Sequence, residues 1–413
     1  MANANIIDAA RTPRGIGKPG KGSLSEIHPQ RLLAAVFKAL QERNDLNTAE
    51  VEDTIVGCSA QIGKQGSCLG RMAVLDAGWD VAAPAVTLDR FCGSGITSVN
   101  LAAANIMSGM ADLCVAGGVE MMSYTGSTPR PGGYATIDAG NVHLRGIHPQ
   151  PHQGICADMI ATLEGITRED VDQLGMESQR RAQVAMENGH FDKSLVPVHH
   201  DDGSLALDHD EFPRPGTTME TLAELKTVFN GFMTTPVDQE TGETFDQLVR
   251  RAYPDLKITH VHHAGNSSGV VDGAAGLVLA SDSYVAKSGL QPRARIVAMA
   301  TTAGDPTLML NEPGPAARRV LEKAGMTLDD IDLIEVNEAF AVVPIKFMRD
   351  LGVDPVKVNV NGGAIALGHP IAATGSILIG TALDELERQD KNTALITMCT
   401  GGGMAPAVII ERV

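Results

Sequence analysis

The chain of 413 residues is long enough for two or three domains, and its 43% hydrophobic and 20% charged residues are typical of a globular protein. A formal net charge of −17 disfavours nucleic acid and anionic membranes as partners, and the six cysteines contain no CxxC pair, which argues against a structural zinc site or a disulfide framework. We find no signal-peptide pattern and no apolar run approaching ~20 residues, so we expect a cytoplasmic protein without a membrane span or a resident metal.

The N-terminal segment predicts a strand at residues 5–9 and then a glycine-rich stretch, 15–21. This stretch formally matches GxGxxG and nearly matches a phosphate-binding loop. However, the residue after Lys21 is glycine rather than Ser or Thr, and the next helix begins only around His28, too late to present its N-terminus to a phosphate. We therefore interpret the stretch as a solvated basic loop.

Two α/β patterns occur twice in the chain, about 280 residues apart. The matching pairs are helix 29–43 with strand 51–57 against helix 315–324 with strand 333–337, and the helix after Cys92 with strand 112–116 against the helix after Gly375 with strand 394–398. A repeat of this kind indicates a duplicated unit, and its alternation of strands and helices indicates parallel sheets flanked by helices.

The composition changes between the two copies. Residues 121–261 contain most of the histidines and charged helices such as 167–188, which predicts an inserted loop-rich domain, and 230–260 resembles a further insertion within it. We therefore expect an N-terminal half formed by 1–120 and 262–289, the inserted domain at 121–261, and a C-terminal half at 290–413.

The sequence DRFCGSG, residues 89–95, places a cysteine between a short predicted strand, 84–88, and a predicted helix, 96–107. A helix N-terminus favours an anion, so we expect Cys92 to be shifted toward the thiolate, as in a nucleophile elbow with sulfur in place of oxygen. The alternative is an ordinary buried cysteine that acts as a small hydrophobe.

Three compact motifs follow in the C-terminal half: residues 337–341 (NEAFA), 361–370 (NGGAIALGHP) and 399–403 (CTGGG). Each places a chemically active residue at a predicted strand or turn end that is rich in small residues. Because the carboxyl ends of the strands in such a fold gather at one crevice, we expect these residues to meet Cys92.

Together, these motifs behind a Cys-Gly-Ser-Gly resemble the thiolase family, the acyl-CoA C-acyltransferases, and the resemblance runs over essentially the whole chain. It implies an α/β fold of two duplicated halves in a layered α-β-α-β-α core, with an inserted loop domain that governs CoA and substrate specificity. It also implies acyl-CoA and CoA as partners, with CoA a co-substrate rather than a permanently bound cofactor, and a homodimer or homotetramer.

The resemblance also implies catalytic roles. Cys92 matches the nucleophile that accepts the acyl group, His369 its activating base, and Cys399 the second cysteine, which moves a proton at the α-carbon of the substrate. Asn337 matches the residue that holds a water in one oxyanion hole, to which His369 also donates. The second oxyanion hole is expected from the backbone N–H groups of Cys92 and Gly401.

For substrate binding, the resemblance places Ser268 beside the pantetheine arm of CoA and Phe340 in the lining of that pocket, and it adds His152 and Ala264 to the CoA and substrate site. Four further histidines are interpreted as surface or loop residues: His199, His200, His262 and His263. Of these, His263 is also a candidate to border the acyl pocket. The remaining cysteines are interpreted as packing residues; they are Cys58, Cys68, Cys114 and Cys156.

The implied reaction is CoA-dependent cleavage of a 3-ketoacyl-CoA to acetyl-CoA and a shortened acyl-CoA, or the reverse condensation of acetyl-CoA to acetoacetyl-CoA. Two alternatives are a ketosynthase-type condensing enzyme, which needs two histidines where this chain has His369 and Cys399, and a noncatalytic thiolase-like lipid-binding protein, which is expected to lose Cys92 or the Asn337 motif. Ala372 and the pair Ala405-Pro406 depart from the family pattern and are expected to alter the substrate pocket rather than the chemistry.

Overall fold

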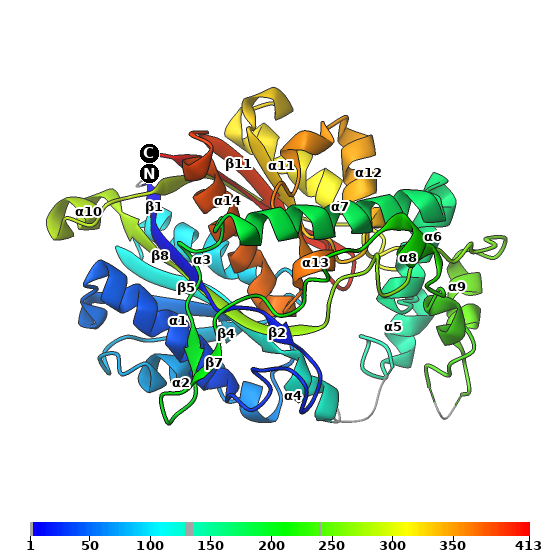
Figure 1. Ribbon diagram of the computed structural model, residues 1–413, viewed down its shortest axis with the longest axis horizontal. Coiled ribbons are helices and arrows are strands. Elements are labelled where there is room, and N and C mark those ends of the chain that lie inside the picture. Colours follow the sequence, from blue (N-terminus) through cyan, green and yellow to red (C-terminus); the bar gives the residue numbers. More distant parts are fainter. Residues whose placement is uncertain (1–2, 129–134, 239–240) are drawn as a thin grey trace.

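The computed structural model describes residues 3–128, 135–238 and 241–413. Its centre is a mixed sheet in which the described strands follow the order β10-β11-β12-β9-β1-β8-β5-β3-β4, with β2 paired to β8 (Figure 1). The strands of this sheet are β1 (Ala4–Arg11), β2 (Gly15–Ile16), β3 (Asp53–Gly57), β4 (Val86–Leu88), β5 (Leu113–Met121), β8 (Val271–Ser281), β9 (Ala294–Ala303), β10 (Leu333–Val336), β11 (Thr393–Thr397) and β12 (Met404–Arg412). A separate two-stranded sheet consists of β6 (Val198–His199) and β7 (Leu205–Leu207).

The two ends of the central sheet repeat one arrangement. On the N-terminal side, β4 and β5 run parallel to β3, and β8 pairs antiparallel with both β5 and β1. On the C-terminal side, β11 runs parallel to β10, and β12 pairs antiparallel with both β11 and β9. The duplication that the sequence predicts is therefore confirmed, and the two copies join where the first residues of β1 and β9 pair.

The helices divide the core into layers. Between the two halves of the sheet, α3 (Ser94–Ser108) and α14 (Thr374–Arg388) share one apolar core with side chains from both halves. The outer face of the N-terminal half is covered by α1 (Pro29–Asn44) and α2 (Leu69–Asp76), and that of the C-terminal half by α11 (Pro313–Ala324) and α12 (Val342–Leu351). The order of layers is α-β-α-β-α, as the resemblance implies.

The central strands have the composition that this layering requires. Every residue of β1, β5 and β8 is buried, and β8 reads VDGAAGLVLAS. A strand covered by helices on both faces loses the alternation of polar and apolar residues and becomes an almost continuous run of small and apolar ones. The high glycine and alanine content that appears in the sequence therefore serves close packing at the centre of the sheet.

The segment 121–261 adds several helices, of which α5, α6, α8 and α9 gather at one end of the molecule while α7 runs across its middle (Figure 1). These helices are α4 (Met122–Ser127), α5 (Val142–Ile147), α6 (Gln153–Glu164), α7 (Arg168–Glu187), α8 (Met219–Ala223) and α9 (Phe245–Ala252), and α10 (Asp282–Ser288) and α13 (Ala364–Leu367) complete the α-helices of the described chain. Helix α7 begins as its sequence predicts, with Thr167 and Asp170 forming a reciprocal capping box. Side chains of α6 and α9 join the apolar core of the C-terminal half. Short 3₁₀ helices lie at Thr48–Glu50, Gly63–Gln65, Phe229–Phe232, Leu328–Asp330, Pro355–Lys357 and Ile371–Ala373.

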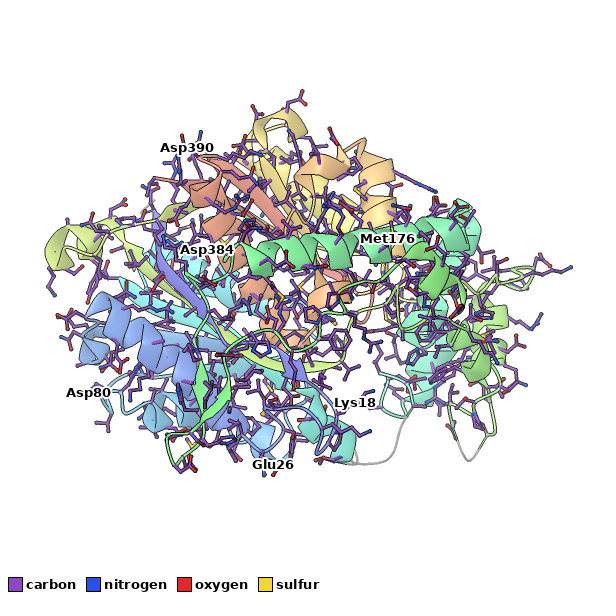
Figure 2. All side chains as sticks on the ribbon, viewed as in Figure 1. Lys18, Glu26, Asp80, Met176, Asp384 and Asp390 are labelled. Atoms are coloured by element: carbon purple, nitrogen blue, oxygen red, sulfur yellow. The ribbon has the colours of Figure 1, made fainter. Side chains whose placement is uncertain are left out.

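The glycine-rich stretch 15–21 does not introduce a helix. Residues 18–21 are exposed, and Lys18 is labelled on this loop in Figure 2. Helix α1 begins only at Pro29, with the side chain of His28 as its cap. The interpretation as a solvated basic loop is confirmed for residues 18–21, whereas Gly15 and Ile16 form strand β2 against β8.

Candidate active site

Cys92 lies on a tight turn between β4 and α3. The hydroxyl of Ser94 accepts a hydrogen bond from the backbone N–H of Arg90 at 2.8 Å and donates one to the carbonyl of Phe91 at 2.7 Å. Phe91 has a φ of +47°, a left-handed conformation that costs energy for a residue with a side chain. The strained residue of this elbow is therefore the one before the cysteine, and the bonds of Ser94 hold it in place.

The thiol of Cys92 is buried, with 4% of the residue exposed. Burial, together with the negative charge of Glu120, raises its pKa to about 12, although a hydrogen bond from the side chain of Gln153 acts in the opposite direction. The expectation that the start of α3 shifts this thiol toward the thiolate is therefore wrong for the substrate-free protein. Desolvation outweighs the favourable backbone dipoles, and Cys92 is a neutral thiol.

The loop that carries Cys399 packs directly on the loop that carries Cys92. A Cβ added at Gly93 would lie 2.5 Å from Cγ2 of Thr400, and one added at Gly401 would lie 3.0 Å from the ring of Phe91. Both glycines are therefore required by the close approach of the two loops. Burial raises the pKa of Cys399, and the charge of an ionised Cys92 contributes to the increase.

His369 is buried and is held on both sides of its ring. Its backbone N–H donates to the carbonyl of Gly269 at 2.9 Å, Nδ1 lies 2.5 Å from Oγ1 of Thr374, and Nε2 lies 3.4 Å from Nδ2 of Asn337. Burial, together with the positive charge of Arg14, lowers the pKa of His369 to about 3. The imidazole is therefore neutral and able to accept a proton.

Asn337 follows the last residue of β10 and is buried. Its backbone N–H donates to the carbonyl of Thr397, at the end of the neighbouring strand β11. When its amide donates to Nε2 of His369, the proton of the neutral ring lies on Nδ1 and is donated to Thr374. Oδ1 of Asn337 has no hydrogen-bond partner among the described residues, so one buried acceptor is available to a water or a substrate.

The segment 267–269 connects the C-terminal motifs. The backbone N–H of Ser268 donates to the carbonyl of Ala339, and that of Gly269 donates to the carbonyl of Ala364, both at 3.0 Å. The ring of Phe340 is buried and packs edge-on against Phe229, with ring centres 5.6 Å apart. The structure thus brings the motifs at 337–341 and 361–370 together with the re-entry of the chain into β8.

The segment after His369 packs against the start of α3. A Cβ added at Gly95 would lie 2.7 Å from the carbonyl oxygen of Ala372, and one added at Gly118 would lie 2.2 Å from it. Ala372 is fully buried and does not line the cavity described next. Its methyl group, in place of the usual glycine, therefore lies behind the histidine loop and not in a substrate pocket.

A cavity of about 580 Å³ opens at Cys92. Its wall combines loops of the N-terminal half, residues 135–137 and 150–153 of the segment between the halves, and two residues of the C-terminal half, Met309 and Ile371. Three side chains of this region that sequence reasoning missed are Glu120, Gln153 and Thr374. The signal for Thr374 was its position at the start of α14, five residues after His369.

Of the four residues expected to bind CoA or substrate, only His152 lines this cavity. Phe340 and Ser268 lie with the C-terminal motifs, and Ala264 is exposed on the segment that leads to them. The ring of His152 nevertheless stacks on Phe229 with centres 5.6 Å apart, and Phe229 packs against Phe340, so an aromatic contact joins the cavity wall to the residues expected beside the pantetheine arm.

Several other side chains are not where the sequence suggests. His262 and His263 are buried, with 0% and 1% exposed, because they bond to Asp158 and Asp172, each at 2.7 Å. Both histidines lie in a loop, as one of the two expected alternatives has it, but neither is at the surface, and His263 does not line the cavity. Cys68 is exposed at the start of α2, so it is not a packing residue, whereas His199 and His200 are exposed and Cys58, Cys114 and Cys156 are buried as expected.

Within the described residues, no group of three His, Cys, Asp or Glu side chains gathers closely enough to hold a metal ion. No helix of the described chain is both long enough and apolar enough to span a membrane.

Comparison with known proteins gives matches over the whole chain. The family description "Thiolase, N-terminal domain" matches residues 4–236, and "Thiolase, C-terminal domain" matches 290–412. A beta-ketoadipyl-CoA thiolase of Acinetobacter baylyi is 39% identical over 100% of both chains, and a steroid 3-ketoacyl-CoA thiolase of Mycobacterium tuberculosis is 38% identical over 100% of this chain and 95% of its own. The crystal structure of human mitochondrial 3-ketoacyl-CoA thiolase is similar with a TM-score of 0.84 and 32% identity, covering 100% of this chain and 99% of that one.

Proposed function

Because the chain belongs to the thiolase family of CoA-dependent acyltransferases, we propose that it is a 3-ketoacyl-CoA thiolase that works through an acyl group on Cys92. One observation carries this assignment. The loops of Cys92 and Cys399 are in direct contact, and a neutral His369 is held close to Asn337 at the same end of the sheet. We assign the nucleophile to Cys92, the base to His369 and the second acid to Cys399.

In the first step, Nε2 of His369 takes the proton of the Cys92 thiol while the sulfur attacks the 3-keto carbon of the substrate. A base whose pKa is near 3 does not remove this proton in advance, so the proton moves as the C–S bond forms. The bond between C2 and C3 then breaks, and the acyl group remains on Cys92 as a thioester. The electron pair of the broken bond stays on acetyl-CoA as an enolate.

Cys399 completes the first half of the reaction by giving its proton to C2 of that enolate. Its raised pKa keeps it protonated, and therefore a proton donor, until the enolate forms. In the second half, CoA gives its thiol proton to Cys399 and attacks the thioester, and His369 returns its proton to Cys92. The products are acetyl-CoA and an acyl-CoA shortened by the acetyl unit, and every group is restored.

Negative charge develops on a carbonyl oxygen in each half. We assign the donors to one such oxygen to Nε2 of His369, after it has taken a proton, and to a water held by the unpartnered Oδ1 of Asn337. The backbone N–H groups of Cys92 and Gly401 are assigned to the other. Removing one such donor typically costs about 3 to 4 kcal/mol of transition-state stabilisation.

The remaining assignments belong to the same proposal. The N-terminal half comprises 1–120 and 262–289, the segment 121–261 sets CoA and substrate specificity, and the C-terminal half comprises 290–413. Ser268, Phe340, His152 and Ala264 contact CoA or substrate. We place the protein in the cytoplasm as a homodimer or homotetramer, a location supported by six cysteines that are all free thiols.

The test is thiolysis of acetoacetyl-CoA. Purified protein with acetoacetyl-CoA and CoA is expected to consume the substrate and to release two acetyl-CoA for each acetoacetyl-CoA. No consumption of acetoacetyl-CoA or of any longer 3-ketoacyl-CoA by folded protein contradicts the proposed function and favours a noncatalytic lipid-binding role.

A further inference from the structure

The cavity at Cys92 has properties that an acetyl group alone does not require. Resting on the thiolase function above, we propose that this cavity binds the acyl part of a bulky, uncharged 3-ketoacyl-CoA.

The cavity has a volume of about 580 Å³. Pockets of roughly 300 to 1,000 Å³ enclose most of the surface of a drug-sized ligand, so an acetyl group on Cys92 would fill only a small part of it. Ser268 and Phe340, which are assigned to the pantetheine arm, lie outside its wall. The space beside the nucleophile is therefore left for the acyl chain.

The wall is mixed, with apolar side chains beside neutral polar ones. Met122, Ile137 and Met309 provide apolar surface from three different parts of the chain, while Gln61 and Gln150 add neutral hydrogen-bonding groups. Such a wall favours an acyl group with a large apolar surface and uncharged oxygen atoms.

The histidine in the wall adds no charge. The ring of His152 stacks on Phe232 with centres 4.8 Å apart, and burial lowers its pKa. Together with the amide groups, it gives the acyl chain a neutral, partly aromatic boundary.

The charge that faces the cavity is negative. Glu120 lines it and accepts hydrogen bonds from the backbone N–H groups of Ser59 and Ala60 at 3.0 and 3.1 Å and from the amide of Gln65 at 2.8 Å. Burial raises the pKa of Glu120, whereas these hydrogen bonds lower it, and all three partners are N–H donors, which is the arrangement that an ionised carboxylate satisfies. An acyl chain that ends in a carboxylate would be repelled by this group.

The described residues of the wall include no lysine or arginine to offset that charge. Arg145 lies behind Thr136, with 1% of its surface exposed, and is already paired with Asp138 at 2.9 Å and Asp238 at 3.0 Å. Its charge is therefore used within the protein, and the wall selects against a terminal carboxylate.

The first experiment compares three substrates of the native enzyme: acetoacetyl-CoA, 3-oxohexanoyl-CoA, and 3-oxoadipyl-CoA, whose chain has the same number of carbons but ends in a carboxylate. We expect kcat/KM for 3-oxohexanoyl-CoA to exceed that for 3-oxoadipyl-CoA at least tenfold. Equal values, or a preference for 3-oxoadipyl-CoA, would overturn the proposal. If the enzyme cleaves none of the three substrates, the result contradicts the thiolase function itself.

A charge added to the wall tests the same point within one protein. Gln61 is exposed, lines the cavity and makes one hydrogen bond through its amide, to the carbonyl of Cys58. In Gln61→Lys we expect the ratio of kcat/KM for 3-oxoadipyl-CoA over 3-oxohexanoyl-CoA to rise at least tenfold, and in the matched uncharged variant Gln61→Met we expect the native ratio. An unchanged ratio in Gln61→Lys contradicts the proposal.

A larger side chain tests the size of the cavity. Thr125 lines it from α4, and its side-chain hydrogen bond stays within that helix. Replacing it with Trp is expected to lower kcat/KM for a ring-bearing uncharged substrate such as 3-oxo-3-phenylpropionyl-CoA at least tenfold relative to acetoacetyl-CoA, while Thr125→Val preserves the native ratio. An equal loss for both substrates in Thr125→Trp would show that the acyl chain lies elsewhere.

Discussion

The two copies of the α/β unit place different chemistry on equivalent backbone. In the N-terminal copy, Cys92 precedes the first turn of α3 and Glu120 lies near the end of β5. In the C-terminal copy, His369 precedes α14 and Cys399 follows the end of β11. Each copy therefore offers one position before its central helix and one at the end of its parallel strand, and only the combination of both copies gives a nucleophile, a base and an acid.

The comparison also shows how the copies are held in register. Helix α3 and the turn before α14 touch through Gly95 and the carbonyl of Ala372, and the ends of β4 and β11 touch through Gly93 and Thr400. No side chain fits at either glycine. The catalytic groups of one copy are thus positioned by backbone contact with the other, which leaves little freedom for the distance between them.

Removing the nucleophile breaks the N-terminal half of this arrangement and has the largest expected effect. In Cys92→Ala we expect kcat/KM for thiolysis of acetoacetyl-CoA to fall by about 10⁴-fold or more, since no acyl-enzyme can form. Cys68→Ala is the control, because that thiol is exposed and does not line the cavity, and it should retain native activity. Substantial thiolysis by Cys92→Ala would contradict the assignment.

Removing the second cysteine breaks the C-terminal half and has a different signature. In Cys399→Ala we expect kcat for carbon–carbon cleavage to fall by about 10³-fold, within the range of lost acid–base catalysis, while Cys92 still accepts an acetyl group from acetyl-CoA. The measurement pairs steady-state thiolysis with intact mass after incubation with acetyl-CoA. Loss of both activities together would assign Cys399 to acylation or to folding.

A smaller effect is expected from substitution of Thr374, whose hydroxyl oxygen accepts a hydrogen bond from Nδ1–H of His369 at 2.5 Å. Thr374→Val leaves a buried N–H without a partner, at a cost of about 1 to 3 kcal/mol, and loosens the ring. We expect kcat to fall by roughly 10- to 100-fold, because 1.4 kcal/mol is a factor of ten in rate. Thr374→Ser keeps the hydroxyl and should restore most of the activity; equal losses in both variants would point to packing instead.

The smallest effect, which is also the most diagnostic, is expected in the pH dependence of Cys92 alkylation, because this rate reports the protonation state of the thiol. With the pKa of Cys92 near 12, the thiolate fraction is small at neutral pH. As long as the pH stays below the pKa, this fraction increases about tenfold for each unit by which the pH is raised. Alkylation of Cys92 by iodoacetamide, followed by peptide mass mapping from pH 6 to 9, should rise with that slope. A plateau below pH 8 would show a preformed thiolate and an ion pair with His369.

Much of the fold could be predicted from the sequence because its signals are local. Helix α7 is marked by its cap, the repeat is visible in hydrophobic periodicity, and α1 and α11 begin within two residues of their predicted starts. The motifs around Cys92, Asn337, His369 and Cys399 were also recognisable, because each is a short run of chemically unusual residues at a strand end.

The errors arose where a distant partner decides the outcome. His262 is buried because Asp158, 104 positions away in sequence, accepts its hydrogen bond, and His263 because of Asp172, 91 positions away. The neutral state of Cys92 depends on burial and on Glu120, neither of which is encoded in the turn that carries it. Local pattern therefore located the nucleophile and misjudged its ionisation.

The acyl-enzyme is the central claim, and mass spectrometry of the protein after incubation with acetyl-CoA tests it most directly. The native chain and Cys399→Ala are each expected to gain one acetyl group, mapped to the peptide that contains Cys92 and removed by added CoA, while Cys92→Ala gains none. Folded native protein that gains no acetyl group, or that gains it at another residue, would contradict the account.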